Sequence, residues 1–135
     1  MKRILLFIGI LAVILPGLGY AQNNAKQKTK LNVYYFHGKN RCPTCLAIEK
    51  ETKDLLNTAY KANLANSSVK FLIIDIEDSK NEELVKKYDV WGSSLILVND
   101  KGKKTDLTED AFSYARNESP KFRKILTETI DKQLK

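Results

Sequence analysis

The 135-residue sequence is poor in side chains that ligate metals or form cross-links. It has two cysteines and one histidine, so at most one internal disulfide can form and a disulfide-rich scaffold is excluded. The same count is one ligand short of a closed tetrahedral zinc site made from cysteine and histidine alone. The chemistry of these three side chains therefore depends on where they stand in the fold.

Long apolar runs are also scarce. The run at the N-terminus, Ile4–Leu18, is shorter than the ~20 residues that span a bilayer core. Two cations precede it, and the small residues Gly19 and Ala21 follow it. This three-part layout predicts a secretory signal peptide over residues 1–21 and export to the periplasm or the extracellular space. The alternative is a membrane tether formed by an uncleaved signal.

Charge of one sign is not concentrated in any segment. The formal net charge is +7, and loss of the predicted signal peptide, with its two cations and no acids, leaves +5. Lysines and arginines are interspersed with acids along helical segments such as "NEELVKKYD", whereas a nucleic-acid surface needs them clustered beside stacking aromatics. We expect a monomer with no nucleic-acid partner and no stable membrane insertion after signal cleavage.

Apolar periodicity predicts one α/β domain over residues 31–135, after a flexible polar linker at residues 22–30. A strand, a helix and a strand of the expected lengths form a parallel crossover unit, and a β-hairpin follows, so the central sheet is expected to be mixed and flanked by helices. The expected elements are a strand at 31–36, a helix from Pro43 to about Ala62, a strand at 69–76, a short helix at 78–90, a hairpin at 93–108 with its turn at 99–102, a helix at 109–117 capped by Thr108, and a last helix from Ser119.

The two cysteines lie in "FHGKNRCPTC" with the spacing C-x-x-C, where a strand gives way to a helix. Cys42 is expected at the helix N-terminus, where free backbone N–H groups, together with nearby Lys39 and Arg41, favour a thiolate. Cys45, one turn later and facing the core, is the expected resolving thiol. The pattern predicts that Cys42 is the nucleophile of a redox dithiol.

Cys42, Pro43, Thr44 and Cys45 after "VYYF" resemble the redox motif of the thioredoxin superfamily, and "YDVWGSSLILVNDKG" resembles a later stretch of the same family. The likeness covers about residues 31–107. It implies a thioredoxin-like fold and a thiol–disulfide oxidoreductase whose redox centre is the Cys42–Cys45 disulfide, without another cofactor. The implied partners are protein or low-molecular-weight thiols and disulfides and an upstream redox partner, and Pro43 and Thr44 are expected to tune the reduction potential.

A narrower likeness involves "YYFHGKNRC" and "AFSYARN". Both are similar to segments of small exported thioredoxin-like proteins of the nitrophenyl-compound nitroreductase subunit ArsF family. That resemblance implies an association with nitroaromatic reduction.

Three positions depart from the thioredoxin pattern. Ser94 stands where thioredoxins have a cis-proline, and a cis bond before serine costs ~2.5–4 kcal/mol, so the Ser93–Ser94 bond is expected to be trans. Arg41 replaces the tryptophan before the first cysteine. The first strand also lacks the buried acid that serves proton transfer, a role for which His37 is a candidate. Trp91, Ser93 and Ser94 are expected to line the substrate groove.

Two other functions are compatible with the same residues. Two thiolates and one imidazole are soft ligands, so Cys42, Cys45 and His37 are candidates for binding or delivering copper or zinc, with a further ligand from elsewhere. Alternatively, the domain is a non-catalytic adaptor subunit of a larger reductase. His37 has a plainer interpretation as well, because a loop histidine can simply end a strand.

Overall fold

The computed structural model describes residues 28–135, so the predicted signal peptide and most of the predicted linker lie outside the described residues. Within residues 28–135, no helix is long and apolar enough to cross a bilayer. The elements are, in chain order, β1 (Leu31–His37), α1 (Pro43–Ala59), α2 (Lys61–Ala65), β2 (Val69–Asp75), the 3-10 helix η1 (Ser79–Asn81), α3 (Glu82–Tyr88), β3 (Ser94–Asn99), β4 (Lys104–Asp106), α4 (Thr108–Tyr114) and α5 (Ser119–Leu134).

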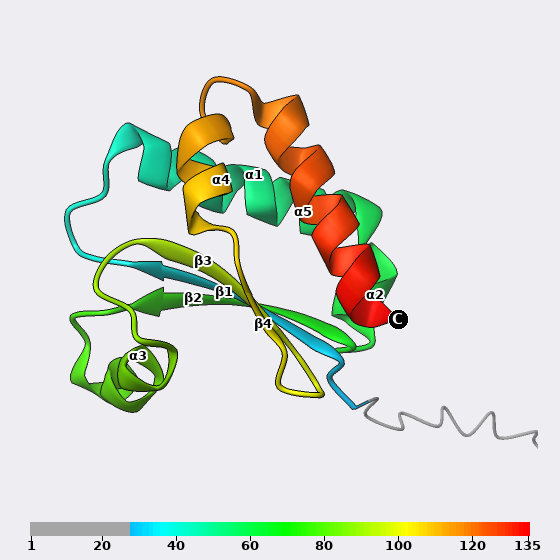
Figure 1. Cartoon of the computed structure of the whole chain (residues 1–135), viewed down its shortest axis with the longest axis horizontal. Coiled ribbons are helices and arrows are strands. Elements are labelled where there is room, and N and C mark those ends of the chain that lie inside the picture. Colours follow the sequence, from blue (N-terminus) through cyan, green and yellow to red (C-terminus); the bar gives the residue numbers. More distant parts are fainter. Residues whose placement is uncertain (1–27) are drawn as a thin grey trace, which may run out of the picture.

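The strands form one mixed sheet in the order β2-β1-β3-β4 (Figure 1). β1 pairs in parallel with β2 and antiparallel with β3, and β3 pairs antiparallel with β4. The predicted crossover unit is therefore β1–α1–β2, and the predicted hairpin is β3–β4. The predicted α/β class with a mixed, helix-flanked sheet is confirmed.

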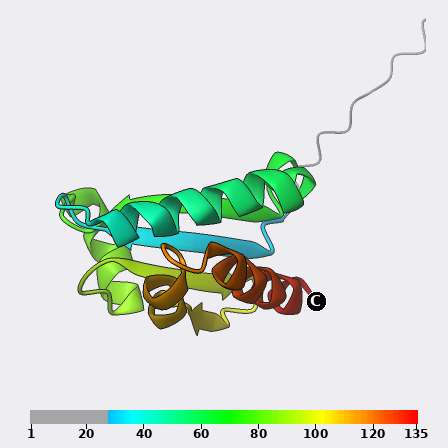
Figure 2. The ribbon, with the colours of Figure 1, turned by 90° about the horizontal axis from the view of Figure 1, so that it is seen from above.

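Helices cover both faces of the sheet. α1, α4 and α5 lie over one face, where α1 and α5 run side by side, and α3 lies on the other (Figures 1 and 2). Side chains of β1 alternate between the two, with Val33 and Tyr35 packed in the core under α1 and α5, and Tyr34 and Phe36 packed in the core beside α3. This double burial explains why β1 is an almost continuous apolar run in the sequence.

The long helix predicted from Pro43 to about Ala62 is interrupted. α1 ends at Ala59, and α2 follows after Tyr60, whose φ of −118° and ψ of 23° are not helical. The Tyr60 side chain is buried, and its hydroxyl donates a hydrogen bond of 2.7 Å to Oδ1 of Asp131 on α5. This contact with α5 accompanies the interruption of the helix, and it joins residues that are 71 positions apart in the sequence.

The predicted capping role of Thr108 is wrong. Thr108 is the first residue of α4, and the cap position, Leu107, makes no side-chain capping bond. The Thr108 hydroxyl instead accepts a hydrogen bond from the N–H of Leu95 at 3.1 Å. Its own N–H donates to Oδ1 of Asp106 at 2.9 Å. The threonine therefore ties the start of α4 to β3.

The hairpin turn follows its sequence signals. Oδ1 of Asn99 accepts hydrogen bonds from the backbone N–H groups of Lys101 and Lys103, at 3.1 and 2.9 Å. Gly102 has a φ of +80°, a conformation that glycine adopts without steric cost. Just after the turn, Nζ of Lys104 donates to the carbonyl oxygen of Tyr88 at 2.8 Å, which links the edge strand to the end of α3.

Candidate active site

The junction of β1 and α1 places Cys42 at the N-cap of α1. Its backbone is extended, with φ −72° and ψ 161°, and Pro43 begins the helix, a position where its missing N–H leaves no bond unmade. Thr44 follows in the first turn. Cys42 therefore stands at the helix N-terminus, where its sulfur can accept from a free N–H of the first turn.

The two sulfurs differ in exposure. Cys42 is exposed and Cys45 is 5% exposed, and the two are joined in a disulfide. The N–H of Cys45 donates to Sγ of Cys42 at 3.1 Å. A donor at this position favours negative charge on that sulfur once the bond is reduced. The outer sulfur is thus both reachable and electrostatically favoured as a thiolate.

Tyr35 lies behind the second cysteine. It is fully buried, and its hydroxyl donates a hydrogen bond of 2.7 Å to the carbonyl oxygen of Cys45. Sequence reasoning looked for an acid in this strand and did not single out Tyr35. The available signal was the alternation in β1, which places Tyr35 on the same face as His37.

His37 ends β1 and stacks on Tyr35, with 5.9 Å between ring centroids. Its Nδ1 lies 3.1 Å from the carbonyl oxygen of Gly38. Because a carbonyl only accepts, this bond requires the proton on Nδ1, which leaves Nε2 as the acceptor of a neutral ring. His37 is therefore held at the same end of the sheet as the disulfide.

The two cations expected to favour a Cys42 thiolate both have carboxylate partners. Lys39 donates its backbone N–H to Oε1 of Glu77 at 2.8 Å, and its Nζ lies 3.5 Å from Oε2 of the same residue. The Arg41 guanidinium forms an ion pair with Glu49 and lies over the Tyr35 ring, 5.5 Å from its centroid. Sequence reasoning missed Glu49 and Glu77, and their charges offset those of the cations.

The loop before β3 completes this end of the molecule. Trp91 is 89% exposed, and its indole N–H donates to Oδ1 of Asp89 at 3.0 Å. Ser94 pairs with Phe36 of β1, and its hydroxyl donates to the carbonyl oxygen of Gly92 at 3.1 Å. Because residues 28–135 contain no cis peptide bond, the Ser93–Ser94 bond is trans, as expected.

The metal hypothesis gains no support from the geometry. Across the described part of the chain, no group of three or more histidine, cysteine, aspartate or glutamate side chains is placed to hold a metal ion. Cys42, Cys45 and His37 are thus not assembled as a ligand set, and the two sulfurs are bonded to each other.

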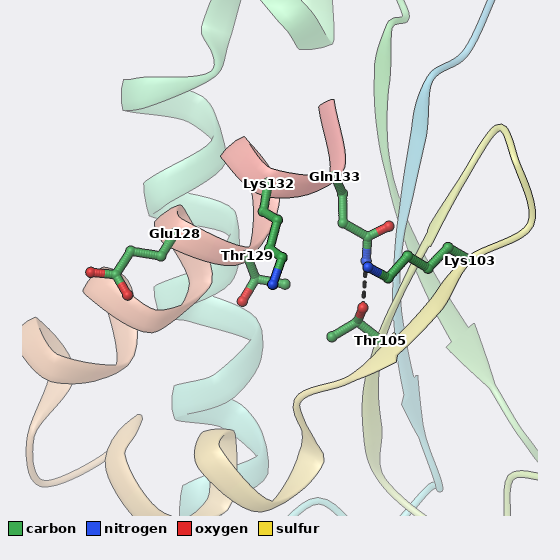
Figure 3. Close-up of a pocket in the computed structure, with 6 residues that line it drawn as sticks. All are labelled: Lys103, Thr105, Glu128, Thr129, Lys132 and Gln133. Carbon is green, nitrogen blue, oxygen red and sulfur yellow. Dashed lines mark hydrogen bonds between the residues drawn. The ribbon is translucent and has the colours of Figure 1, made fainter. Parts of the chain in front are cut away.

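A hollow of 280 Å³ lies away from the disulfide, between the β3–β4 hairpin and the end of α5 (Figure 3). Gln133 is buried at its edge and donates to the Thr105 hydroxyl at 2.7 Å. Lys103 and Lys132 also line it. None of the residues predicted for catalysis contributes to it.

The sheet order, the helical layers and the C-x-x-C disulfide at the start of α1 define a thioredoxin-like α/β domain. A solved structure that shares this fold is the disulphide isomerase from Xylella fastidiosa Temecula1, with a TM-score of 0.52 and 21% identity over 88% of this chain and 99% of that chain. A malarial protein of known structure is 23% identical over 66% of this chain and 99% of that chain, with a TM-score of 0.43. No protein-family model and no curated protein matches the sequence. At 21% identity, the similarity to the isomerase establishes the fold alone.

Proposed function

We propose that the protein is an exported thiol–disulfide oxidoreductase in which Cys42 is the nucleophile and Cys45 the resolving thiol. The observation that carries this proposal is the unequal placement of the two sulfurs, one exposed at a helix N-cap and one buried a turn later. An inert structural bridge gains little from this arrangement, because so short a loop removes little entropy from the unfolded chain. The shared fold with a disulphide isomerase supports the same chemistry.

The proposed reaction is a two-step exchange. The Cys42 thiolate attacks one sulfur of a substrate disulfide, so that a mixed disulfide forms and the other substrate sulfur leaves as a thiolate. Cys45 then loses its proton and attacks Sγ of Cys42, which releases the second substrate thiolate. The protein dithiol is oxidised by two electrons and the substrate disulfide is reduced by two. In the opposite direction the Cys42–Cys45 disulfide oxidises a substrate dithiol.

Single cysteine variants test the proposal. We expect Cys42→Ser to abolish the dithiothreitol-dependent reduction of insulin, because the attacking sulfur is gone. We expect Cys45→Ser to accumulate mixed disulfides with insulin, visible by mass spectrometry and reversed by reductant, because the resolving step is blocked. Wild-type activity in both variants would overturn the proposal.

The direction of exchange follows from the reduction potential. Equilibration of the protein in glutathione buffers of defined ratio measures that potential through the fraction of oxidised Cys42 and Cys45. A value near thioredoxin's ~−270 mV would assign a reductase, and one near ~−120 mV an oxidant. Both neighbouring cations are neutralised by carboxylates, so they stabilise the Cys42 thiolate less. We therefore expect a more negative reduction potential, as in a reductase.

The exposed loop at Trp91 supports docking of a polypeptide beside the disulfide. Large aromatic side chains contribute disproportionately to protein interfaces, and Trp91 is almost fully exposed in the isolated domain. The same loop favours a second candidate function, a non-catalytic adaptor subunit of a larger reductase. A variant with both cysteines replaced by serine separates the two, because an adaptor keeps its partner and the partner's activity, whereas an oxidoreductase loses its turnover.

Export rests on the N-terminal sequence. Removal of residues 1–21 would leave a mature chain that starts at Gln22. N-terminal sequencing of the protein recovered from the periplasm or medium of a bacterial host tests this, and an intact N-terminus in the membrane fraction would support the tethered alternative.

A further inference from the structure

The side chain of Arg41, the residue before Cys42, reaches Glu49 on helix α1 and is only 23% exposed. Its guanidinium meets two groups, the carboxylate of Glu49 and the face of the fully buried Tyr35 ring. A cation over an aromatic ring and a second contact to a carboxylate fix both the position and the charge environment of the guanidinium. The cation nearest to Cys42 in the sequence is thus anchored.

Glu49 shares a helix face with the two cysteines. It lies one turn after Cys45, a spacing at which helix residues are neighbours, and two turns after Cys42 along the same face. Its side chain is 22% exposed, so solvent screens its charge less than that of a fully exposed glutamate. Without Arg41, this negative charge would disfavour a thiolate on the same face.

From these contacts we infer that Arg41 and Glu49 are an opposed pair of positioning residues that sets the reactivity of the Cys42–Cys45 couple. Each charge offsets the effect of the other on the sulfurs. The inference rests on the proposed function, because it concerns the dithiol that this function uses.

The neighbouring charges have partners elsewhere. On α1, Lys50 pairs with Asp54 and Glu51 pairs with Arg123 of α5. In the loop, Lys39 pairs with Glu77. Tyr35 supplies the ring under the guanidinium from β1, and its hydroxyl is committed to the Cys45 carbonyl. Among these ion pairs, the Arg41–Glu49 pair is therefore the closest in sequence to the two cysteines, and Glu49 lies on their helix face.

The effects of the two single substitutions have opposite signs. Glu49→Gln leaves the Arg41 charge uncompensated, so the thiolate of Cys42 is favoured and the reduced form is stabilised. Arg41→Gln leaves the carboxylate of Glu49 unpaired, so the thiolate is disfavoured. The double variant removes both charges and returns the balance close to that of the wild type. A pair that serves only to hold the fold would instead lower stability in both variants without this reversal.

The test is a thiolate titration of the reduced full domain, followed by absorbance at 240 nm and by the rate of alkylation with iodoacetamide. Below the midpoint, we expect Glu49→Gln to raise the thiolate population of Cys42 about threefold and Arg41→Gln to lower it about threefold, as expected for a unit charge in a partly screened site. The double variant should fall within about 1.5-fold of the wild type.

Glu51→Gln is the matched control. It makes the same change of charge on the same helix and also breaks an ion pair, with Arg123, so its titration should superimpose on that of the wild type. Circular dichroism verifies that each variant folds. If Glu49→Gln does not fold, Arg41→Gln carries the test alone. It should lower the thiolate population of Cys42, whereas the Glu51→Gln control should leave that population unchanged.

Coincident titrations of wild type and Glu49→Gln, shifts of equal sign in the two single variants, or an equal shift in Glu51→Gln would overturn the inference. The titration needs no substrate, so it is independent of turnover. If the variants shift as expected but no variant exchanges disulfides with insulin, the proposed function fails and the inference stands. If the wild type is active while the titrations coincide, the inference fails alone.

Discussion

Tyr35 connects the core of the domain to its disulfide. The ring is buried under α1, stacks with the His37 ring and lies under the Arg41 guanidinium. Its hydroxyl reaches the carbonyl oxygen of Cys45. One side chain therefore contacts the backbone of Cys45, the His37 ring and the Arg41 guanidinium, and the bond to Cys45 requires the hydroxyl of a tyrosine.

Tyr35→Phe removes only the hydroxyl, so it isolates that bond. We expect a loss of about 1 kcal/mol in the free energy of unfolding, the usual net value of a buried hydrogen bond. Urea denaturation of the oxidised and the reduced protein measures it in both states. An unchanged unfolding midpoint in both would show that the bond to Cys45 contributes nothing to the fold.

At the scale of residues, what the sequence could predict was local. The position of Cys42 at a helix start depends on the few residues around it, so spacing and Pro43 were enough to predict it. The contact of Lys39 with Glu77 joins residues 38 positions apart, and no local pattern indicates it. Glu49 was missed because a charged residue on a helix surface usually has only a solvated role.

Helix α1 has a buried face and an exposed face, and the disulfide lies where they meet. Ile48 is 1% exposed in the core, whereas Leu46, one turn after Cys42, is 51% exposed. Exposed leucines are common on protein surfaces, but this one lies on the same helix face as Cys42. The two residues therefore allow stability and substrate contact to be tested separately.

We expect Ile48→Ala to lower the free energy of unfolding by about 2–5 kcal/mol, because it leaves a cavity in the core. Leu46→Ala should change it by less than about 0.5 kcal/mol, as is usual for exposed positions. The same leucine variant should slow reduction of insulin but leave the reaction with a small aromatic disulfide unchanged. Equal rates on insulin for wild type and Leu46→Ala would remove Leu46 from the docking surface.

At the scale of elements, sequence periodicity predicted which helices and strands exist and in which order. It did not predict the break in the first long helix, because residues on both sides of Tyr60 continue a helical pattern and the hydrogen bond to Asp131 comes from α5. The role of Thr108 was wrong for a related reason. A threonine at the start of a helix often caps it, but here the Thr108 hydroxyl accepts a hydrogen bond from the N–H of Leu95 in β3.

For the molecule as a whole, two hydrophobic cores lie on opposite faces of the sheet, and tyrosines take part in both. Burial, and after it the interaction with the Tyr88 hydroxyl, together raise the pKa of Tyr34 from 10.0 to about 12. Burial also raises the pKa of Tyr60. The folded protein thus holds these phenolic protons more tightly than the unfolded chain does.

The consequence is a loss of stability in alkali. Below pH 10 the phenols are protonated in both states, and their contribution is fully present. Between pH 10 and about 12 the unfolded chain releases the Tyr34 proton more readily, so the free energy of unfolding should fall as pH rises. Urea denaturation at intervals from pH 8 to pH 12 measures the slope. Tyr34→Phe, referenced to its own stability at pH 8, should flatten it, and an unchanged slope would contradict this assignment.

Trp91 is the chain's single tryptophan, and it lies in the exposed loop before β3. Its indole is already in water in the folded domain, so its fluorescence should change little when the chain unfolds. A polypeptide that covers the loop would move the same indole into an apolar environment and shift its emission to the blue. The fluorescence of Trp91 would therefore report a polypeptide that binds over this loop, while changing little on denaturation.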